Sequence, residues 1–172
     1  EQTGVNGVGA LLSLDGELGS DDVIVYLTSQ PFSNAQPISV IDVHDSGLDL
    51  GDLGTDKLDI YGSTNELIGD NFLLRRNFVA LLPATTSGAA EFAGRVNYDF
   101  TINRGLQLFG QAGDDYFALD DNSVITSIDG GDGDDRFQVG QMFQSLREDP
   151  IMFEFPRVFG DASFRDDVFE TI

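Results

Sequence analysis

Short apolar segments with an alternation of period two recur along the chain. Four of them are residues 23–27 (VIVYL), 58–61 (LDIY), 96–102 (VNYDFTI) and 137–139 (FQV). Alternation of this kind places successive side chains on opposite faces of an extended backbone, so each segment is predicted to be a β-strand. Long stretches with helical periodicity do not occur in the sequence. The pattern therefore predicts an all-β chain in which short strands and turns follow one another.

The segments between strands share a spacing of glycine and aspartate. Residues 14–23 (LDGELGSDDV), 108–117 (LFGQAGDDYF) and 128–137 (IDGGDGDDRF) align as apolar-x-Gly-x-x-Gly-x-Asp-x-apolar. A fourth, degenerate copy with an insertion begins at residues 60–62 (IYG) and ends at residues 69–74 (GDNFLL). A repeated unit of strand and turn cannot bury its apolar face alone, and it does so by stacking on the next copy.

The predicted fold class is accordingly all-β, a parallel β-solenoid of the β-roll or β-helix type with irregular Asp/Gly turns. Residues 56–172 hold the better copies and are predicted to form the solenoid proper. Residues 1–55 hold one loose copy, and for them a less regular, β-sandwich-like extension with Asp/Gly hairpin turns is the alternative. One continuous domain over residues 1–172 is also compatible with the length of the chain.

Aspartate dominates the charge of the chain. With 30 acidic and 9 basic residues the formal net charge is −21, which argues against nucleic acid and anionic membrane as partners. Carboxylates are densest between residues 110 and 135, where Arg104 and Arg136 are the nearest basic residues on either side. Such a cluster is self-repelling unless a cation neutralises it. It therefore predicts a bound divalent ion. The aspartates of the cluster are Asp114, Asp115, Asp120, Asp121, Asp129, Asp132, Asp134 and Asp135.

Two further features narrow the class of protein. Cysteine is absent, so disulfides and thiolate-bound zinc play no part in the fold. The longest apolar run, residues 78–82 (FVALL), is far too short to span a bilayer, so no membrane insertion is expected. The chain begins at Glu1 rather than at methionine, and we expect a mature product or an excised fragment.

One turn carries a specific motif. Residues 130–138 (GGDGDDRFQ) fit the nonapeptide G-G-x-G-x-D-x-U-x at every defined position, and residues 110–118 (GQAGDDYFA) fit it with Gln111 in place of the second glycine. The chain thus resembles the RTX, or haemolysin-type, calcium-binding repeat family, in the degenerate form found in large bacterial extracellular and surface proteins. Family arrays repeat every nine residues, whereas these two copies begin 20 residues apart, at Gly110 and Gly130.

Calcium takes six to eight oxygen ligands at roughly 2.3–2.6 Å, and Asp115 and Asp135 can each supply a carboxylate. With 20 residues per coil, the two turns are expected to stack on one edge of the fold, about 4.8 Å apart. The resemblance implies that ions lie between such turns, held by these two aspartates and by nearby glycine carbonyls. The aspartates at variable positions of the motif either ligate through their side chains or face water. The candidate metal-site residues are Gly113, Asp114, Asp115, Gly131, Asp132, Gly133, Asp134 and Asp135.

These features predict a calcium-binding structural module of a large secreted or cell-surface bacterial protein. The resemblance implies an extracellular location and a role in adhesion, extracellular matrix or filament assembly. One alternative is the RTX-like portion of a secreted protease, lipase or polysaccharide-modifying enzyme whose catalytic domain lies elsewhere. Another is a carbohydrate-active enzyme built on the solenoid itself. No catalytic residue is assigned, and the single histidine, His44, is expected to be a surface or turn residue.

The last part of the chain differs in composition from the rest. Residues 150–172 contain five phenylalanines and two arginines within 23 positions, on an otherwise acidic protein. This stretch is interpreted either as a cap over the last coil or as a contact through which copies associate head to tail. Calcium ions and a second copy of the chain are therefore the predicted partners.

Overall fold

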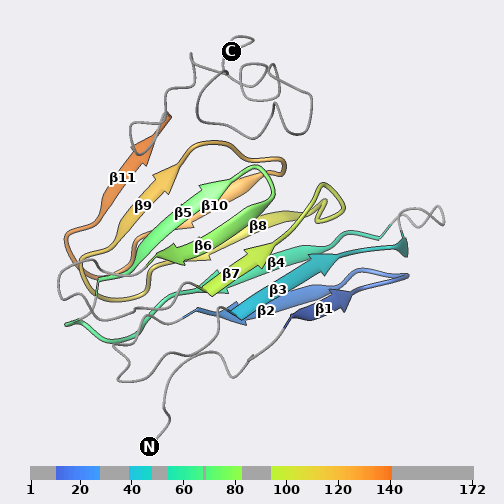
Figure 1. Ribbon diagram of the computed structural model, residues 1–172, viewed down its shortest axis with the longest axis horizontal. Helices are drawn as coiled ribbons and strands as arrows, with labels where there is room; N and C mark the ends of the chain where they lie inside the picture. Colours follow the sequence, from blue (N-terminus) through green and yellow to red (C-terminus); the bar gives the residue numbers. More distant parts are fainter. Residues whose placement is uncertain (1–10, 28–38, 48–53, 68, 83–93, 141–172) are drawn as a thin grey trace, which may run out of the picture.

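The computed structural model describes residues 11–27, 39–47, 54–67, 69–82 and 94–140, and every regular element among them is a β-strand (Figure 1). The predicted all-β class is confirmed. No helix of the described residues is long and apolar enough to cross a membrane. The strands are β1 (Leu12–Asp15), β2 (Asp22–Tyr26), β3 (Ser39–His44), β4 (Lys57–Tyr61), β5 (Asn71–Arg75), β6 (Phe78–Leu82), β7 (Gly94–Asn97), β8 (Gly105–Phe109), β9 (Tyr116–Leu119), β10 (Thr126–Asp129) and β11 (Arg136–Val139).

The strands form two sheets that lie face to face (Figure 1). The larger sheet has the order β1-β3-β7-β6-β5-β9-β11, and the smaller has the order β10-β8-β4-β2. All pairs in both sheets are parallel except the two made by β6, which runs antiparallel to β5 and β7. Strands on both sides of residue 55 share sheets, since β2 pairs with β4 and β3 pairs with β7.

Apart from the β5–β7 segment, consecutive strands belong to opposite sheets. β8 and β10 lie in the smaller sheet, while β9 and β11 lie in the larger one. Thr126 pairs with Leu106, and Arg136 pairs with Tyr116, so partner residues on these strands are 20 positions apart in sequence. This offset brings the two best copies of the motif onto neighbouring strands, as the spacing of the copies predicted.

The core lies between the two sheets and is filled by the inward side chains of the alternating strands. Leu58, Ile60 and Leu108 of the smaller sheet are fully buried, as are Phe72 and Phe117 of the larger sheet. Parallel pairing places like residues side by side, and the rings of Phe72 and Phe117 stack with their centroids 5.3 Å apart. The Phe117 and Phe137 rings stack in turn at 5.0 Å. Such stacked aromatic pairs stabilise the fold beyond the area that they bury.

The alternation between sheets is interrupted once, by β5, β6 and β7. These three consecutive strands all lie in the larger sheet, and a tight turn at Arg76 and Asn77 joins β5 to β6. The chain then returns to the smaller sheet through residues 98–104 before β8. The interruption adds one antiparallel strand to an otherwise parallel arrangement.

One predicted strand is shorter than expected. Residues 96–102 alternate in polarity, but β7 ends at Asn97 and a turn follows. The carboxylate of Asp99 accepts a hydrogen bond from the backbone N–H of Thr101 at 2.9 Å, which stabilises an Asx turn in place of an extended backbone. Tyr98 and Ile102 are nevertheless buried, so the alternation reflects two anchors of a turn and not one continuous strand.

The C-terminal stretch 150–172, with its predicted role in self-association, lies outside the described residues.

The inter-sheet core predicts a clear contrast between buried and exposed apolar positions. Leu108 is fully buried, whereas Leu67 is 94% exposed. We expect Leu108→Ala to lower the free energy of unfolding by about 2–4 kcal/mol, because it leaves a cavity that the rigid sheets cannot fill. Leu67→Ala is the matched control and should change it by less than about 0.5 kcal/mol. Urea unfolding of both variants measures the difference, and equal effects would contradict this position of the core.

Candidate metal centre

Three turns that lead from the smaller sheet to the larger one lie next to one another along a single edge. They are residues 62–70, 110–115 and 130–135, and we call this edge the stack edge. Ala112 and Asp132 form a parallel bridge directly between two of the turns. In addition, the Gly113 N–H donates to the Asp132 carbonyl, and the Asp132 N–H donates to the Gln111 carbonyl, both at 2.9 Å. The stacking of the two motif turns on one edge, which their spacing predicted, is therefore present.

The three aligned copies of the motif share one backbone conformation. The residue after the first glycine has a positive φ in each copy, 61° at Glu17, 79° at Gln111 and 95° at Gly131. The second glycine of the pattern has a positive φ as well, 127° at Gly19, 110° at Gly113 and 134° at Gly133. Glycine adopts such angles without steric cost, whereas Glu17 and Gln111 must tolerate the left-handed region. The first copy nevertheless lies on the other edge, because residues 16–21 lead from the larger sheet to the smaller one.

The aspartate that ends each turn on the stack edge bonds to the turn before it. The Asp70 N–H donates to Asp115 Oδ1 at 2.7 Å, and the Asp115 N–H donates to Asp135 Oδ1 at 3.0 Å. We call Asp70, Asp115 and Asp135 the aspartate stack. One oxygen of each of the last two carboxylates thus satisfies a backbone donor just before a strand begins, where charge-assisted bonds are strong.

The second oxygen of each stack carboxylate folds back over the glycine that opens its own turn. A Cβ atom on Gly110 would lie 2.0 Å from Asp115 Oδ2 and 2.4 Å from the Gly130 carbonyl oxygen. The Asp115 carboxylate and the carbonyl of the next turn therefore both border the space that the missing side chain leaves. The same relation holds one turn earlier, where a Cβ on Gly62 would lie 2.5 Å from Asp70 Oδ2 and 2.8 Å from the Gly110 carbonyl.

Asp115 has the most unusual environment of the stack. It is only 1% exposed, and its Oδ2 atom is buried without a hydrogen-bond partner. Burial, together with the negative charges of Asp70, Asp135 and Asp114, raises the pKa of its carboxyl group to about 6, against the opposing effect of the hydrogen bond from the Asp70 N–H. Within the described part of the chain, no ion pair involves Asp115 or Asp135.

The nearest basic residues of the sequence bind elsewhere. Arg104 pairs with Asp22 at 3.3 Å, and the guanidinium of Arg136 lies 5.4 Å from the centre of the Tyr116 ring. Neither therefore neutralises the Asp115 carboxylate, and a buried charge without a partner is costly.

The aspartates at the variable positions of the motif point outward. Asp114, Asp132 and Asp134 are all exposed. The Asp134 N–H donates to Asp114 Oδ1 at 2.9 Å, which ties the two turns together from the solvent side. The glycines approach one another closely, since a Cβ on Gly133 would lie 2.2 Å from the Gly113 carbonyl and one on Gly131 would lie 2.3 Å from the Gln111 carbonyl. The structure thus brings the eight candidate residues into one pair of turns, in which Asp115 is the one buried aspartate.

The oxygen atoms on this edge are of the kind that a hard cation binds, and they include backbone carbonyls as well as carboxylates. Among the described residues, no three side chains of Asp, Glu or His converge in a geometry that would hold a metal ion. The unpartnered Asp115 oxygen and the facing Gly130 carbonyl are both ligands that calcium accepts. Calcium held here would depend on backbone carbonyls as much as on aspartate, and on movement of neighbouring carboxylates.

Two features of the aspartate ladders were not predicted from the sequence. Asp70, which closes the degenerate copy, belongs to the stack. A second ladder lies on the opposite edge, where the Asp21 N–H donates to Asp56 Oδ1 at 2.9 Å and the Asp56 N–H donates to Asn103 Oδ1 at 3.0 Å. Burial raises the pKa of Asp56, and the nearby charges of Asp45 and Asp21 add to the increase. The signal available in the sequence was an Asp or Asn one or two residues before a strand.

Comparisons with protein-family models, with curated proteins and with solved structures found no match for this chain.

Two glycines with the same strained backbone offer a test of the close approach between turns. Gly133 and Gly19 have φ values of 134° and 127°, but a Cβ on Gly19 would meet nothing within 4 Å. We expect each alanine substitution to lower the free energy of unfolding by about 1–3 kcal/mol, because alanine is strained at a positive φ. Gly133→Ala should lose about 1–3 kcal/mol more, because the Gly113 carbonyl must move. Equal losses in thermal unfolding would show that the turns do not pack as described.

The raised pKa of Asp115 predicts a pH dependence in the calcium-free protein. An unfolded aspartate titrates near pH 3.9, whereas the Asp115 carboxyl in the folded protein has a pKa of about 6. Between these values the folded state binds more protons than the unfolded state, so stability falls as the pH rises from about 4 to about 6. We expect this fall, on the order of 1–2 kcal/mol, to be absent in Asp115→Asn. Urea unfolding of both proteins in chelator across this range measures it, and parallel curves would contradict it.

Proposed function

We propose that this chain is a calcium-stabilised β-solenoid module of a secreted or cell-surface protein. Support for a solenoid comes from the path of the chain, which passes between two facing, mostly parallel sheets, with a 20-residue offset in the pairs β8–β10 and β9–β11. Two turns with positive φ at the same two positions, residues 110–115 and 130–135, then lie next to each other on the stack edge. Each such coil buries its apolar residues on the next.

The observation that carries the calcium proposal is the buried, unpartnered Asp115 Oδ2 opposite the Gly130 carbonyl. Two oxygens that both accept hydrogen bonds repel each other unless a proton or a cation lies between them. A proton can lie between the two oxygens only while the Asp115 carboxyl is protonated. Because the pKa of this carboxyl is about 6, the group is largely ionised at pH 7. At neutral pH a cation therefore accounts for the arrangement better than a proton does.

Calcium is the cation that the donor set favours. The available ligands are carboxylate and carbonyl oxygens, and calcium tolerates irregular arrangements of six to eight of them. Sites of extracellular modules bind calcium at roughly 10⁻⁴–10⁻³ M, so at about 1 mM free calcium each would contribute roughly 0.4–1.4 kcal/mol. That contribution is a sizeable share of the stability of a marginally stable fold. In a low-calcium cytoplasm, before secretion, calcium would not bind and the contribution would be absent. The resemblance of residues 110–118 and 130–138 to RTX repeats points to the same ion and the same location.

The proposed role is structural. A stack of coils held together by ions at its edge is a rigid, extendable unit, which suits adhesion, matrix or filament assembly outside the cell. Head-to-tail association of copies belongs to the same proposal, since the strands at both ends of the described sheets leave large apolar side chains exposed. Val139 on β11 is 79% exposed, and Ile24 and Tyr26 on β2 are 54% and 58% exposed.

A pair of charge-matched variants tests the calcium proposal. Asp115→Asn retains the Oδ1 acceptor for the Asp70 N–H and replaces the unpartnered Oδ2 with an amide donor that faces the Gly130 carbonyl. Asp129→Asn removes the same charge from an exposed site on β10, next to the turn. In chelator we expect Asp115→Asn to be as stable as the parent protein or more stable. With about 1 mM calcium the parent and Asp129→Asn should gain roughly 1–6 °C in melting temperature per site, and Asp115→Asn should gain less.

Calorimetric calcium titration of the three proteins accompanies the melting experiment. A parent protein whose melting and backbone exchange over residues 105–140 are unchanged by calcium would contradict the proposal. So would an Asp115→Asn variant that binds calcium as well as Asp129→Asn does, because the ion would then lie elsewhere.

A further inference from the structure

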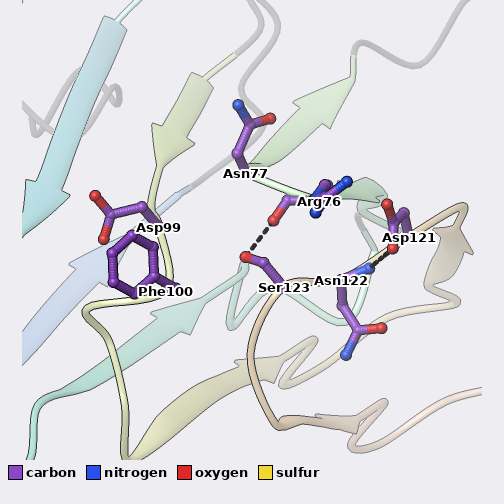
Figure 2. A pocket seen from close by; sticks show the side chains of 7 residues that line it. All are labelled: Arg76, Asn77, Asp99, Phe100, Asp121, Asn122 and Ser123. Carbon is purple, nitrogen blue, oxygen red and sulfur yellow. Dashed lines mark hydrogen bonds between the residues drawn. The ribbon is translucent and has the colours of Figure 1, made fainter. Parts of the chain in front are cut away.

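A pocket lies where the alternation of strands between the two sheets is interrupted. It is on the edge opposite the stack edge, and three turns contribute to it: the β5–β6 turn with Arg76 and Asn77, the β7–β8 turn with Asp99 and Phe100, and residues 121–123 between β9 and β10 (Figure 2). Its volume is about 530 Å³, within the range typical of small-molecule sites. Insertions in repeat proteins often supply the binding face, and two of the lining residues, Arg76 and Asn77, belong to the turn that leads into the antiparallel strand β6.

The walls of the pocket are held by hydrogen bonds that cross between the turns. The Tyr98 N–H donates to the Asn77 carbonyl at 3.0 Å, and the Tyr98 hydroxyl donates to the Arg75 carbonyl at 2.9 Å. The Ser123 hydroxyl donates to the Arg76 carbonyl, a bond that Figure 2 shows as a dashed line. The three turns are thus fixed relative to one another before any ligand binds, which lowers the entropic cost of binding.

Phe100 is the unusual member of the lining. Its side chain is 66% exposed, although Tyr98 and Ile102 of the same turn are buried. Figure 2 shows Phe100 and Asp99 on one side of the pocket, with Ser123 and Asn122 across from them. An aromatic ring held at the rim of a polar pocket offers an apolar face to a ligand that is otherwise hydrophilic.

The polar groups around this ring are mixed in kind. Asn122 donates its side-chain amide to the Val124 carbonyl at 2.8 Å, and one oxygen of Asp99 accepts from the Thr101 N–H at 2.9 Å. The side chain of Asn77 makes no hydrogen bond with another described residue. The pocket therefore offers oriented carboxylate and amide groups, of which the carboxylates accept hydrogen bonds and the amides both donate and accept.

The charge of the pocket lining determines which hydrophilic ligands it favours. Two carboxylates, Asp99 and Asp121, and one guanidinium, Arg76, line the pocket, so it is net negative on a chain that is itself acidic. An anionic ligand is disfavoured by this field. A neutral ring with an apolar C–H face and a periphery of hydroxyl groups fits the aromatic ring, the polar groups and the negative charge of the pocket. Its hydroxyls can donate to the carboxylates while its C–H face lies on the aromatic ring.

From the juxtaposition of the exposed Phe100 ring with the carboxylates and amides of two neighbouring turns, we infer that this pocket binds a neutral saccharide through one pyranose ring. The role is binding and not catalysis. This site is separate from the stack edge and does not rest on the calcium proposal. It would give an extracellular module direct contact with a polysaccharide.

The test is a titration of the isotope-labelled chain by NMR in about 1 mM calcium. The probes are the methyl glycosides of glucose, galactose, mannose and N-acetylglucosamine, with galacturonate as the charged comparison. We expect at least one neutral glycoside to shift the backbone signals of residues 98–100 and 121–123, with a Kd in the millimolar range that is usual for a single small contact. Phe100→Ala should weaken binding about tenfold or more, which corresponds to roughly 1.4 kcal/mol.

Controls separate binding in the pocket from other effects. Asn77→Ala should weaken binding several-fold, while Ile125→Ala, which removes an 80% exposed side chain outside the pocket lining, should leave it unchanged. Repeating the titration in chelator keeps the outcome distinct from that of the calcium experiment. The inference is overturned if no neutral glycoside shifts these signals up to about 50 mM, if Phe100→Ala binds as the parent does, if galacturonate binds more tightly, or if calcium alone produces the same shifts.

Discussion

Parallel strand pairing in register is the constraint on which the rest of this structure depends. It places each residue beside the residue of the same position in the neighbouring coil, so whatever one coil presents, the next presents again about 4.8 Å away. For apolar residues the consequence is favourable. The Phe72, Phe117 and Phe137 rings stack in the larger sheet, the first two of them buried in the core, and the Tyr26, Tyr61 and Phe109 rings stack on the outer face of the smaller sheet. For aspartate it is unfavourable, because like charges are then held side by side.

The aspartate stack therefore needs a reason beyond hydrogen bonding. The Oδ1 atoms of Asp115 and Asp135 accept backbone N–H groups just before strands begin, but an amide oxygen could accept the same bonds without charge. The opposite edge shows this substitution, because Asn103 there accepts the Asp56 N–H in the position that Asp135 occupies toward Asp115. A neutral acceptor is thus compatible with the fold, and carboxylates at Asp70, Asp115 and Asp135 add repulsion that a structural role alone does not explain. The cation that we propose between the turns would compensate for this repulsion.

The local conformation of the turns and the stacking of the copies at Gly110 and Gly130 could be predicted from the sequence, but the edge on which the first copy lies could not. The alignment of residues 14–23, 108–117 and 128–137 identified one turn type, and the shared positive φ values confirm it. Which edge a turn occupies depends on the number of strands that separate it from the next copy, so the copy at Gly16 lies opposite the one at Gly110. The alternation over residues 96–102 predicts one strand, but an Asx turn buries two apolar residues, Tyr98 and Ile102, with a spacing that also fits a strand. The ladder of Asp21, Asp56 and Asn103 was missed because its members are 35 and 47 residues apart and belong to no common motif.

The two edges of the molecule differ in the way a repeated structure can acquire function. On the stack edge the copies remain regular, and regularity itself produces the cluster of oxygens, since each turn adds the same carboxylate and carbonyl. On the opposite edge the added strand β6 breaks the register of turns and leaves three dissimilar turns around one pocket. Departures from local regularity tend to mark functional sites, because nothing in the packing of the sheets requires them. Phe100 follows this rule, because an apolar side chain that the core could have used is instead left at the rim of a polar pocket.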